Sequence, residues 1–133
     1  MKLTNRSEYA LLALIHLNRH YGAGFVTVES IATAQGIPYK FLEQIMTTLK
    51  LSRYVTSVKG KNGGYRLAKT ADKINLAEII RLFDGALAPT ESVSHYFYEP
   101  TPIEKEAKII DVLRDIREFI ADKLENTTLA DVT

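Results

Sequence analysis

The stretch from residue 37 to residue 65 limits the fold of this chain most, because it joins a helix pattern directly to a hairpin pattern. Apolar side chains first recur at helical spacing, at Phe41, Leu42, Ile45, Met46 and Leu49. Residues 54–58 are rich in β-branched side chains, which predicts a strand, and residues 65–67 predict the returning strand. Between them lie three glycines and Asn62, which tolerate the positive φ of a tight turn. A helix followed by a basic hairpin predicts a winged helix.

Two further helices are predicted before this stretch. The first spans about residues 5–20, with Thr4 or Ser7 as its cap. A short strand candidate follows at residues 25–28, and a second helix is expected over residues 29–34. The sequence thus places two helices ahead of the helix that begins near residue 38.

A glycine-containing turn joins the second predicted helix to the third. Gly36 stops one helix, and Pro38 fits the first turn of the next, where a missing N–H costs least. Two short helices joined by such a turn form a helix-turn-helix. With a fourth helix expected over residues 76–83, the sequence predicts a mainly α-helical winged helix-turn-helix domain over residues 1–85.

A long helix pattern follows a proline-containing segment, residues 86–102, which is interpreted as an ordered loop or a mobile connector. The helix is expected over about residues 103–125, and residues 103–133 are interpreted as a region that consists of a dimerisation helix and a tail. One apolar stripe consists of Ile103, Ala107, Ile110, Leu113, Ile120 and Leu124. A second stripe beside it consists of Ile109, Val112, Ile116 and Phe119.

Two apolar stripes on one helix require two partners. One is the chain's own domain, and the second is the same helix of another copy, so a homodimer is predicted. The alternative is a single wide stripe on one core. Candidate interface residues are Ile109, Val112, Leu113, Ile116, Phe119 and Ile120.

The formal net charge of +1 hides an asymmetry between the two halves of the chain. Residues 1–73 hold eleven Lys or Arg and four Asp or Glu, a net charge of +7. Residues 74–133 hold six Lys or Arg and twelve Asp or Glu, a net charge of −6. Such asymmetry is typical of a protein in which one half meets a polyanion, although two ordinary solvated faces also explain it. Together with the wing, it favours double-stranded DNA as a partner.

The composition excludes several other classes. The absence of cysteine excludes disulfides, thiolate zinc sites and all-thiolate iron–sulfur ligation. No nucleophile elbow, phosphate loop or metalloprotease motif is present, so an enzyme is not expected. No apolar run approaches the roughly 20 residues of a membrane span, and no export signal is recognised. The expected compartment is the cytoplasm.

The polar side of the third helix predicts the DNA contacts. Glu43 can accept from cytosine N4, and Gln44 can pair with adenine or another base edge. In the alternative interpretation, Glu43 pairs with Lys40 or Lys50 and reads no base. Asn62 either reads the minor groove or makes the turn. The phosphate-contact candidates are Lys50, Arg53, Lys59 and Lys61.

Histidines offer weaker candidates for a site. His16 and His20 have the i, i+4 spacing that can hold a metal, but no acidic third ligand lies close, so ordinary structural histidines are favoured. His95 precedes three aromatic residues in the connector, and this cluster either lines an effector pocket or packs onto the core. The cluster consists of His95, Tyr96, Phe97 and Tyr98.

Five segments together resemble the Rrf2 family of bacterial winged helix-turn-helix transcription regulators. They read LTNRSEYALLALIHL, IATAQGIPYKFLEQIMTTL, VTSVKGKNGGYRLAK, INLAEIIRLFDG and the closing NTTLADV. The resemblance covers nearly the whole chain, and FLEQI followed by a G-x-x-GGY wing at this spacing is specific.

The resemblance implies a homodimer, joined through the long helix, on an inverted-repeat operator. It implies that Tyr39, Lys40, Glu43 and Gln44 approach bases and that Lys59 is the basic residue at the wing base. Many members bind an iron–sulfur cluster through three cysteines between the fourth and the long helix. Residues 86–102 hold none here, so a regulator, most simply a repressor, without a cofactor is expected. The alternatives are a protein-interaction module that touches no DNA and a regulator controlled by a partner enzyme.

Overall fold

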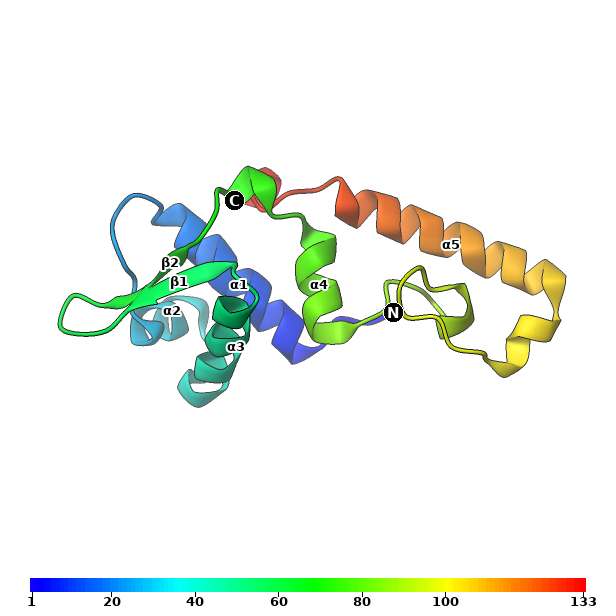
Figure 1. Cartoon of the computed structure of the whole chain (residues 1–133), viewed down its shortest axis with the longest axis horizontal. Helices are drawn as coiled ribbons and strands as arrows, with labels where there is room; N and C mark the ends of the chain where they lie inside the picture. Colours follow the sequence, from blue (N-terminus) through cyan, green and yellow to red (C-terminus); the bar gives the residue numbers. More distant parts are fainter.

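The computed structural model describes all residues 1–133 and consists of a winged domain with a long helix beside it (Figure 1). The chain leaves the winged domain through the connector, and the long helix then returns toward it (Figure 1). The helices are α1 Asn5–Arg19, α2 Val28–Gln35, α3 Tyr39–Leu51, α4 Leu76–Asp84 and α5 Ala107–Glu125. The antiparallel strands are β1 Val55–Val58 and β2 Gly64–Leu67. None of these helices is both long and apolar enough to cross a bilayer. The predicted fold class is confirmed.

Polar caps fix where the helices begin. The side chain of Thr4 accepts from Ser7 N and caps α1, and Thr27 accepts from Ser30 N and caps α2. Ser7 has another role, since its hydroxyl donates to Asp84 at 2.6 Å. Pro38 occupies the position just before α3 rather than its first turn. The caps therefore satisfy helix N–H groups that would otherwise lack partners.

The main core buries one side of α3. Its apolar stripe packs with α1 and α2, and Leu42, Met46 and Leu49 are fully buried. Phe41, expected in the stripe, is instead partly exposed and meets Tyr9 edge-on, with 5.5 Å between ring centroids. Because one side of α3 is buried, its opposite side faces water.

The wing has a third segment along its edge. Val26 and Tyr65 exchange both backbone hydrogen bonds, at 2.8 and 2.7 Å. The expected strand over residues 25–28 is nevertheless wrong, since it reduces to this one bridge. The reason is that Thr27 already caps α2 and Val28 is already helical. A Cβ on Gly64 would lie 2.4 Å from the Val26 carbonyl oxygen, so only glycine allows this approach.

The connector contains two short 3-10 helices, Glu91–Val93 and Pro102–Lys105. The second corrects the expected start of the long helix, because Ile103 lies in it and extended Glu106 separates it from α5. The first stripe of α5 covers its own chain: Ile110 and Leu113 pack with Ala88 and Val93. Ile120 and Leu124 pack against the cluster of Ala77, Ile80 and Leu87.

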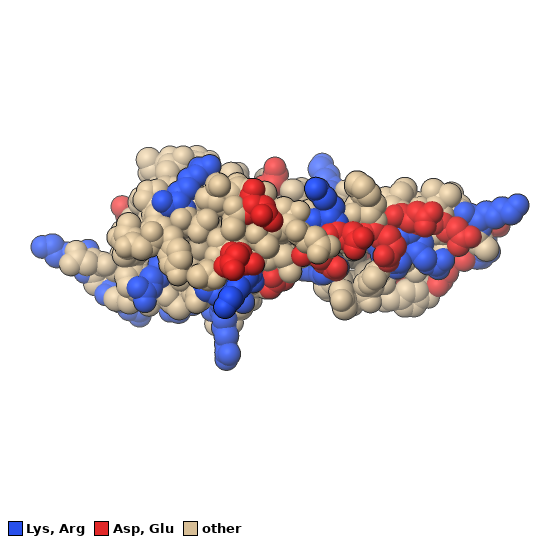
Figure 2. Space-filling model, turned by 90° about the horizontal axis from the view of Figure 1, so that it is seen from above, with Lys and Arg blue, Asp and Glu red and all other residues tan.

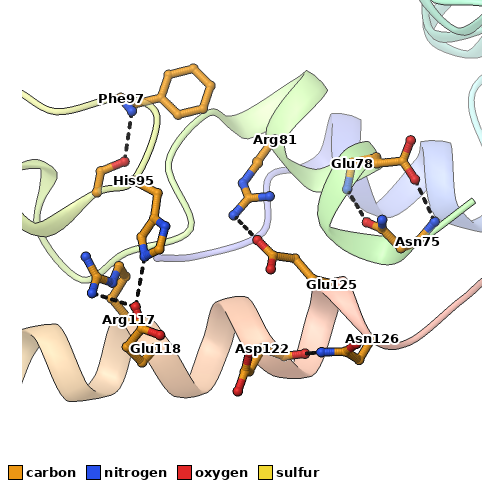
Figure 3. Close-up of polar contacts among 11 residues, drawn as sticks. Asn75, Glu78, Arg81, His95, Phe97, Arg117, Glu118, Asp122, Glu125 and Asn126 are labelled. Atoms are coloured by element: carbon orange, nitrogen blue, oxygen red, sulfur yellow. Dashed lines mark hydrogen bonds and ion pairs between the residues drawn. The ribbon is translucent and has the colours of Figure 1, made fainter.

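The tail after α5 returns to the winged domain. Leu129 is fully buried in the main core, and its amide donates to the Ile74 carbonyl oxygen at 2.8 Å. The amide of Leu76 donates to the Thr127 carbonyl oxygen at 2.9 Å. Nearby, Arg81 of α4 pairs with Glu125 of α5 at 2.7 Å (Figure 3). The C-terminal end of α5 is thus fastened to the domain that carries α3.

We expect Leu129→Ala to destabilise the protein by about 2–5 kcal/mol, because it leaves a cavity in the main core. Urea unfolding, followed by circular dichroism, measures the change. The control is Val132→Ala, whose side chain is 40% exposed and whose effect should stay within about 0.5 kcal/mol. Equal effects of the two substitutions would contradict the role given to Leu129.

Candidate nucleic-acid interface

The exposed side of α3 carries four of the predicted contact residues. Tyr39, Lys40, Glu43 and Gln44 are all exposed, opposite the buried stripe. Glu43 forms no ion pair within 4.0 Å, so the pairing with Lys40 or Lys50 is absent from this structure. Its negative charge raises the pKa of Tyr39, which lies one turn earlier on the helix. These side chains can donate and accept at base edges.

Thr47 lies one turn after Glu43 on the same exposed side and is a further candidate contact that the sequence patterns did not indicate. Its hydroxyl donates to the Glu43 carbonyl oxygen at 3.0 Å, which leaves its methyl group for other contacts. Leu51, a further turn on, is 79% exposed. Methyl groups on such a face can contact the C5-methyl of thymine. The helical spacing alone could have identified both.

The wing presents its polar residues at the turn. Lys59, Lys61 and Asn62 are exposed, and the turn closes through Gly63 N donating to the Gly60 carbonyl oxygen at 3.1 Å. The positive φ angles of the wing belong to Gly60 and Gly64, and not to Asn62. Turn geometry therefore does not require Asn62, whose side chain forms no hydrogen bond within the chain.

Charge is divided along the molecule as the sequence indicated. Figure 2 shows Lys and Arg side chains projecting around the winged end, while Asp and Glu gather along the half that contains α5. A polyanion is therefore attracted to the winged end and repelled from much of the other.

Arg53 is strained. It follows α3, is exposed, and has φ 66°, the only positive φ of a residue other than glycine in the chain. The left-handed region brings the Cβ of such a residue close to its own backbone. Arg53 is thus a residue kept at a position that glycine would occupy more easily.

A polar network braces the wing against α4. The Tyr54 hydroxyl donates to Glu78 at 3.0 Å, and burial together with this bond raises the pKa of Tyr54 to about 12. Glu78 in turn accepts from the Asn75 amide at 2.8 Å, and the Glu78 amide donates back to the Asn75 side chain (Figure 3). The start of β1 is therefore fixed to the same helix that α5 contacts.

The predicted dimer-interface residues fall into two groups. Ile109, Val112, Ile116 and Phe119 are 43–74% exposed and form an apolar stripe on the outer side of α5. Leu113 and Ile120 contact their own chain, as described above. Only the first group leaves a large apolar surface in water within one copy of the chain.

The connector aromatics lie beside α5 and α4. His95 bonds to Glu118 at 2.9 Å and, with Arg117, lowers the pKa of that carboxyl (Figure 3). The guanidinium of Arg81 lies 4.7 Å from the centre of the Tyr96 ring. A shallow pocket of about 280 Å³ is lined by Asp84, Gly85, Ala86, Glu91, Tyr96, Phe97, Tyr98 and Glu99. These eight residues lie together only because the connector folds over the end of α4.

No metal centre is assembled. No group of three or more His, Cys, Asp or Glu side chains converges anywhere in the chain. The His16 and His20 rings are tilted by 37° with their centroids 4.3 Å apart, and the His20 imidazole donates to the His16 carbonyl oxygen at 2.9 Å. Burial, with His20 and Arg19 nearby, lowers the pKa of His16.

Comparisons with known proteins identify chains that are similar in sequence and fold. The model of the family "Rrf2", described as "Iron-dependent Transcriptional regulator", matches residues 3–133. The HTH-type transcriptional regulator IscR of Erwinia tasmaniensis is 34% identical, over 99% of this chain and 78% of the relative. The structure of CymR, the global cysteine regulator of B. subtilis, is 30% identical with a TM-score of 0.84, covering 99% of this chain and 95% of that one. The structure of T. potens IscR is 30% identical with a TM-score of 0.71, and the match covers 99% of this chain and 85% of that one.

We expect Arg53→Gly to stabilise the protein, because the cost of about 1–2 kcal/mol for the left-handed region exceeds the added chain entropy of glycine. A gain of about 0.5–1 kcal/mol should appear in urea unfolding. The matched control is Lys61→Gly at the wing, where φ is not positive and no gain is expected. An unchanged or lower stability of Arg53→Gly would show that no strain is stored there.

Proposed function

Because the chain belongs to the Rrf2 family of DNA-binding transcriptional regulators, we propose that it binds an inverted-repeat operator as a homodimer and represses transcription there. The family is not enzymatic. The observation that carries the proposal is the exposed polar side of α3 beside a basic wing, on the half of the chain with a net charge of +7.

In the proposed complex, α3 enters the major groove. Glu43 and Gln44 read base edges, with Tyr39 and Lys40 at the start of the helix beside them. The wing lies along the backbone, where Lys59 and Lys61 meet phosphates and Asn62 reaches the minor groove. Lys50 and Arg53, at the end of α3, meet phosphates on the other side.

The proposed dimer forms through the outer stripe of α5. Its four apolar side chains would otherwise remain in water, and a second copy presents the same stripe. Because α5 is fastened to the winged domain at its C-terminal end, pairing of α5 sets the distance between the two copies of α3. Half-site spacing in the operator follows from that distance.

The donor set in this chain does not fit an iron–sulfur cluster. Such clusters depend on thiolates, and the chain contains no cysteine. The one connector histidine, His95, is bonded to Glu118. The proposed regulator therefore carries no cluster. After anaerobic purification, metal analysis should find no iron, and the visible absorption spectrum should show no cluster band.

The connector is the proposed place for an effector. Its aromatic residues lie between α4, at the edge of the winged domain, and α5. A small molecule held by His95, Tyr96, Phe97 or Tyr98, or a partner protein docked there, would shift the balance between α5 arrangements only if it binds one of them better.

For base readout, we expect Glu43→Ala or Gln44→Ala to relax preference at one position in each half-site, by about 1–3 kcal/mol. The operator is first identified by sequencing genomic fragments that the protein retains, and affinities for single-base variants are then measured by electrophoretic shift. A helix variant with wild-type specificity would contradict the assignment.

Lys59→Ala provides the contrasting case. It should weaken binding to all DNA sequences alike and lower the slope of log affinity against log salt concentration by about one. Lys105→Ala, a lysine far from the wing, is the matched control and should change neither quantity. If no genomic fragment is retained at low salt, the chain is better explained as a protein-interaction module.

For assembly, we expect Ile116→Asp to yield monomers that bind the operator poorly, because a carboxylate would be buried at the centre of the stripe. Sedimentation velocity at micromolar concentration measures the association state. Asp115→Asn, next to it on the acidic side of α5, is the control and should remain dimeric. A monomeric wild-type chain under these conditions would exclude the proposed dimer.

A further inference from the structure

A cavity lies between the end of α1, the loop that follows it and strand β2 of the wing. Its volume is about 430 Å³, within the range of small-molecule sites, and we name it the α1–β2 cavity. We propose that it binds a small organic anion, namely a carboxylate attached to an apolar ring or chain. This site is separate from the DNA-contacting residues and from the connector.

The floor of the cavity is apolar. Leu17 and Leu67 are 3% and 6% exposed, and Val26 completes this part of the lining. These side chains belong to α1, the edge of the wing and β2, so the floor exists only in the folded protein. An apolar group placed on it would be removed from water.

The charged part of the lining is entirely basic. Arg66 and His20 line the cavity, no Asp or Glu does, and neither basic residue takes part in an ion pair. The Arg66 guanidinium carbon lies 4.6 Å from the centre of the Phe25 ring, a cation–π contact that uses none of its N–H donors. A flat guanidinium with free donors matches a carboxylate in bidentate geometry.

Further donors line the same cavity. The amides of Gly22 and Gly24 donate no hydrogen bond within the chain. A carbonyl oxygen only accepts, so the bond from His20 Nδ1 to the His16 carbonyl places the hydrogen on Nδ1. His20 Nε2 has no partner in the chain.

The cavity adjoins the part of the wing that the loop supports. Val26, which lines it, makes both backbone bonds to Tyr65, and Arg66 is the next residue of β2. A ligand that joins α1 to β2 would restrain the hairpin that carries Lys59 and Lys61. An effect on operator affinity rests on the proposed function, whereas binding of the anion does not.

The test is isothermal titration calorimetry of the full chain with benzoate at constant ionic strength and pH 7. Benzyl alcohol and benzylamine, equal in size but neutral and cationic, are titrated in parallel, as is inorganic phosphate. We expect benzoate to bind one site per chain and the other three probes to bind at least tenfold more weakly. Equal binding of benzyl alcohol, or tighter binding of phosphate, would overturn the proposal.

Variants locate the site. Arg66→Gln should weaken benzoate binding at least tenfold, and His20→Gln should weaken it by a smaller factor. Arg19→Gln, an arginine one residue from His20 that does not line the cavity, should leave binding unchanged. Circular dichroism confirms that each variant is folded. Wild-type benzoate affinity in Arg66→Gln, or equal losses in Arg66→Gln and Arg19→Gln, would overturn the assignment.

Operator binding is measured separately. A loss of DNA affinity in Arg66→Gln, with benzoate binding intact, would identify Arg66 as a phosphate contact of DNA and would also overturn the proposal. Failure of benzoate to bind while the operator is still bound would remove the cavity site and leave the regulator unaffected.

Discussion

Burial of one side of α3 is the interaction on which the rest of the structure depends. Leu42, Ile45, Met46 and Leu49 are at most 1% exposed, and they pack with α1 and α2. A helix buried on one side must present its other side, so the same packing that forms the core also exposes the polar residues that can meet DNA. The exposure of this polar side therefore needs no interaction beyond those that form the core.

Two attachments transmit the position of α3 to α5. Leu129 inserts into the core that holds α3, and Arg81 pairs with Glu125 across α4 and α5. The Tyr54–Glu78 bond connects the wing to α4 as well. In the proposed dimer, a change in how the two copies of α5 pack would thus move whole winged domains, because interior packing is dense and does not deform gradually.

The sequence predicted what depends on local spacing and failed where distant segments decide. Thr4 is one of the two caps that the sequence offers for the first helix, because capping is local, and the stripe of α5 follows from its period. The strand at residues 25–28 was wrong because capping by Thr27 outweighs β-propensity. Leu129 was not recognised as a core residue, since one leucine in a short tail has no period. The α1–β2 cavity joins residues 17–26 to residues 66–68, a contact that no local pattern reveals.

The two proposed ligand sites differ in charge, and this difference bears on how each can act. The connector pocket is lined by Asp84, Glu91 and Glu99, whereas Arg66 and His20 line the α1–β2 cavity. A cationic ligand suits the first, and an anionic ligand suits the second, so one small molecule does not fit both. In the proposed dimer, the first lies beside the helix that sets the spacing between the two winged domains, and the second lies at the support of the wing. An effector at the connector would therefore change which half-site spacing is bound, while one in the cavity would change the affinity of each half-site separately.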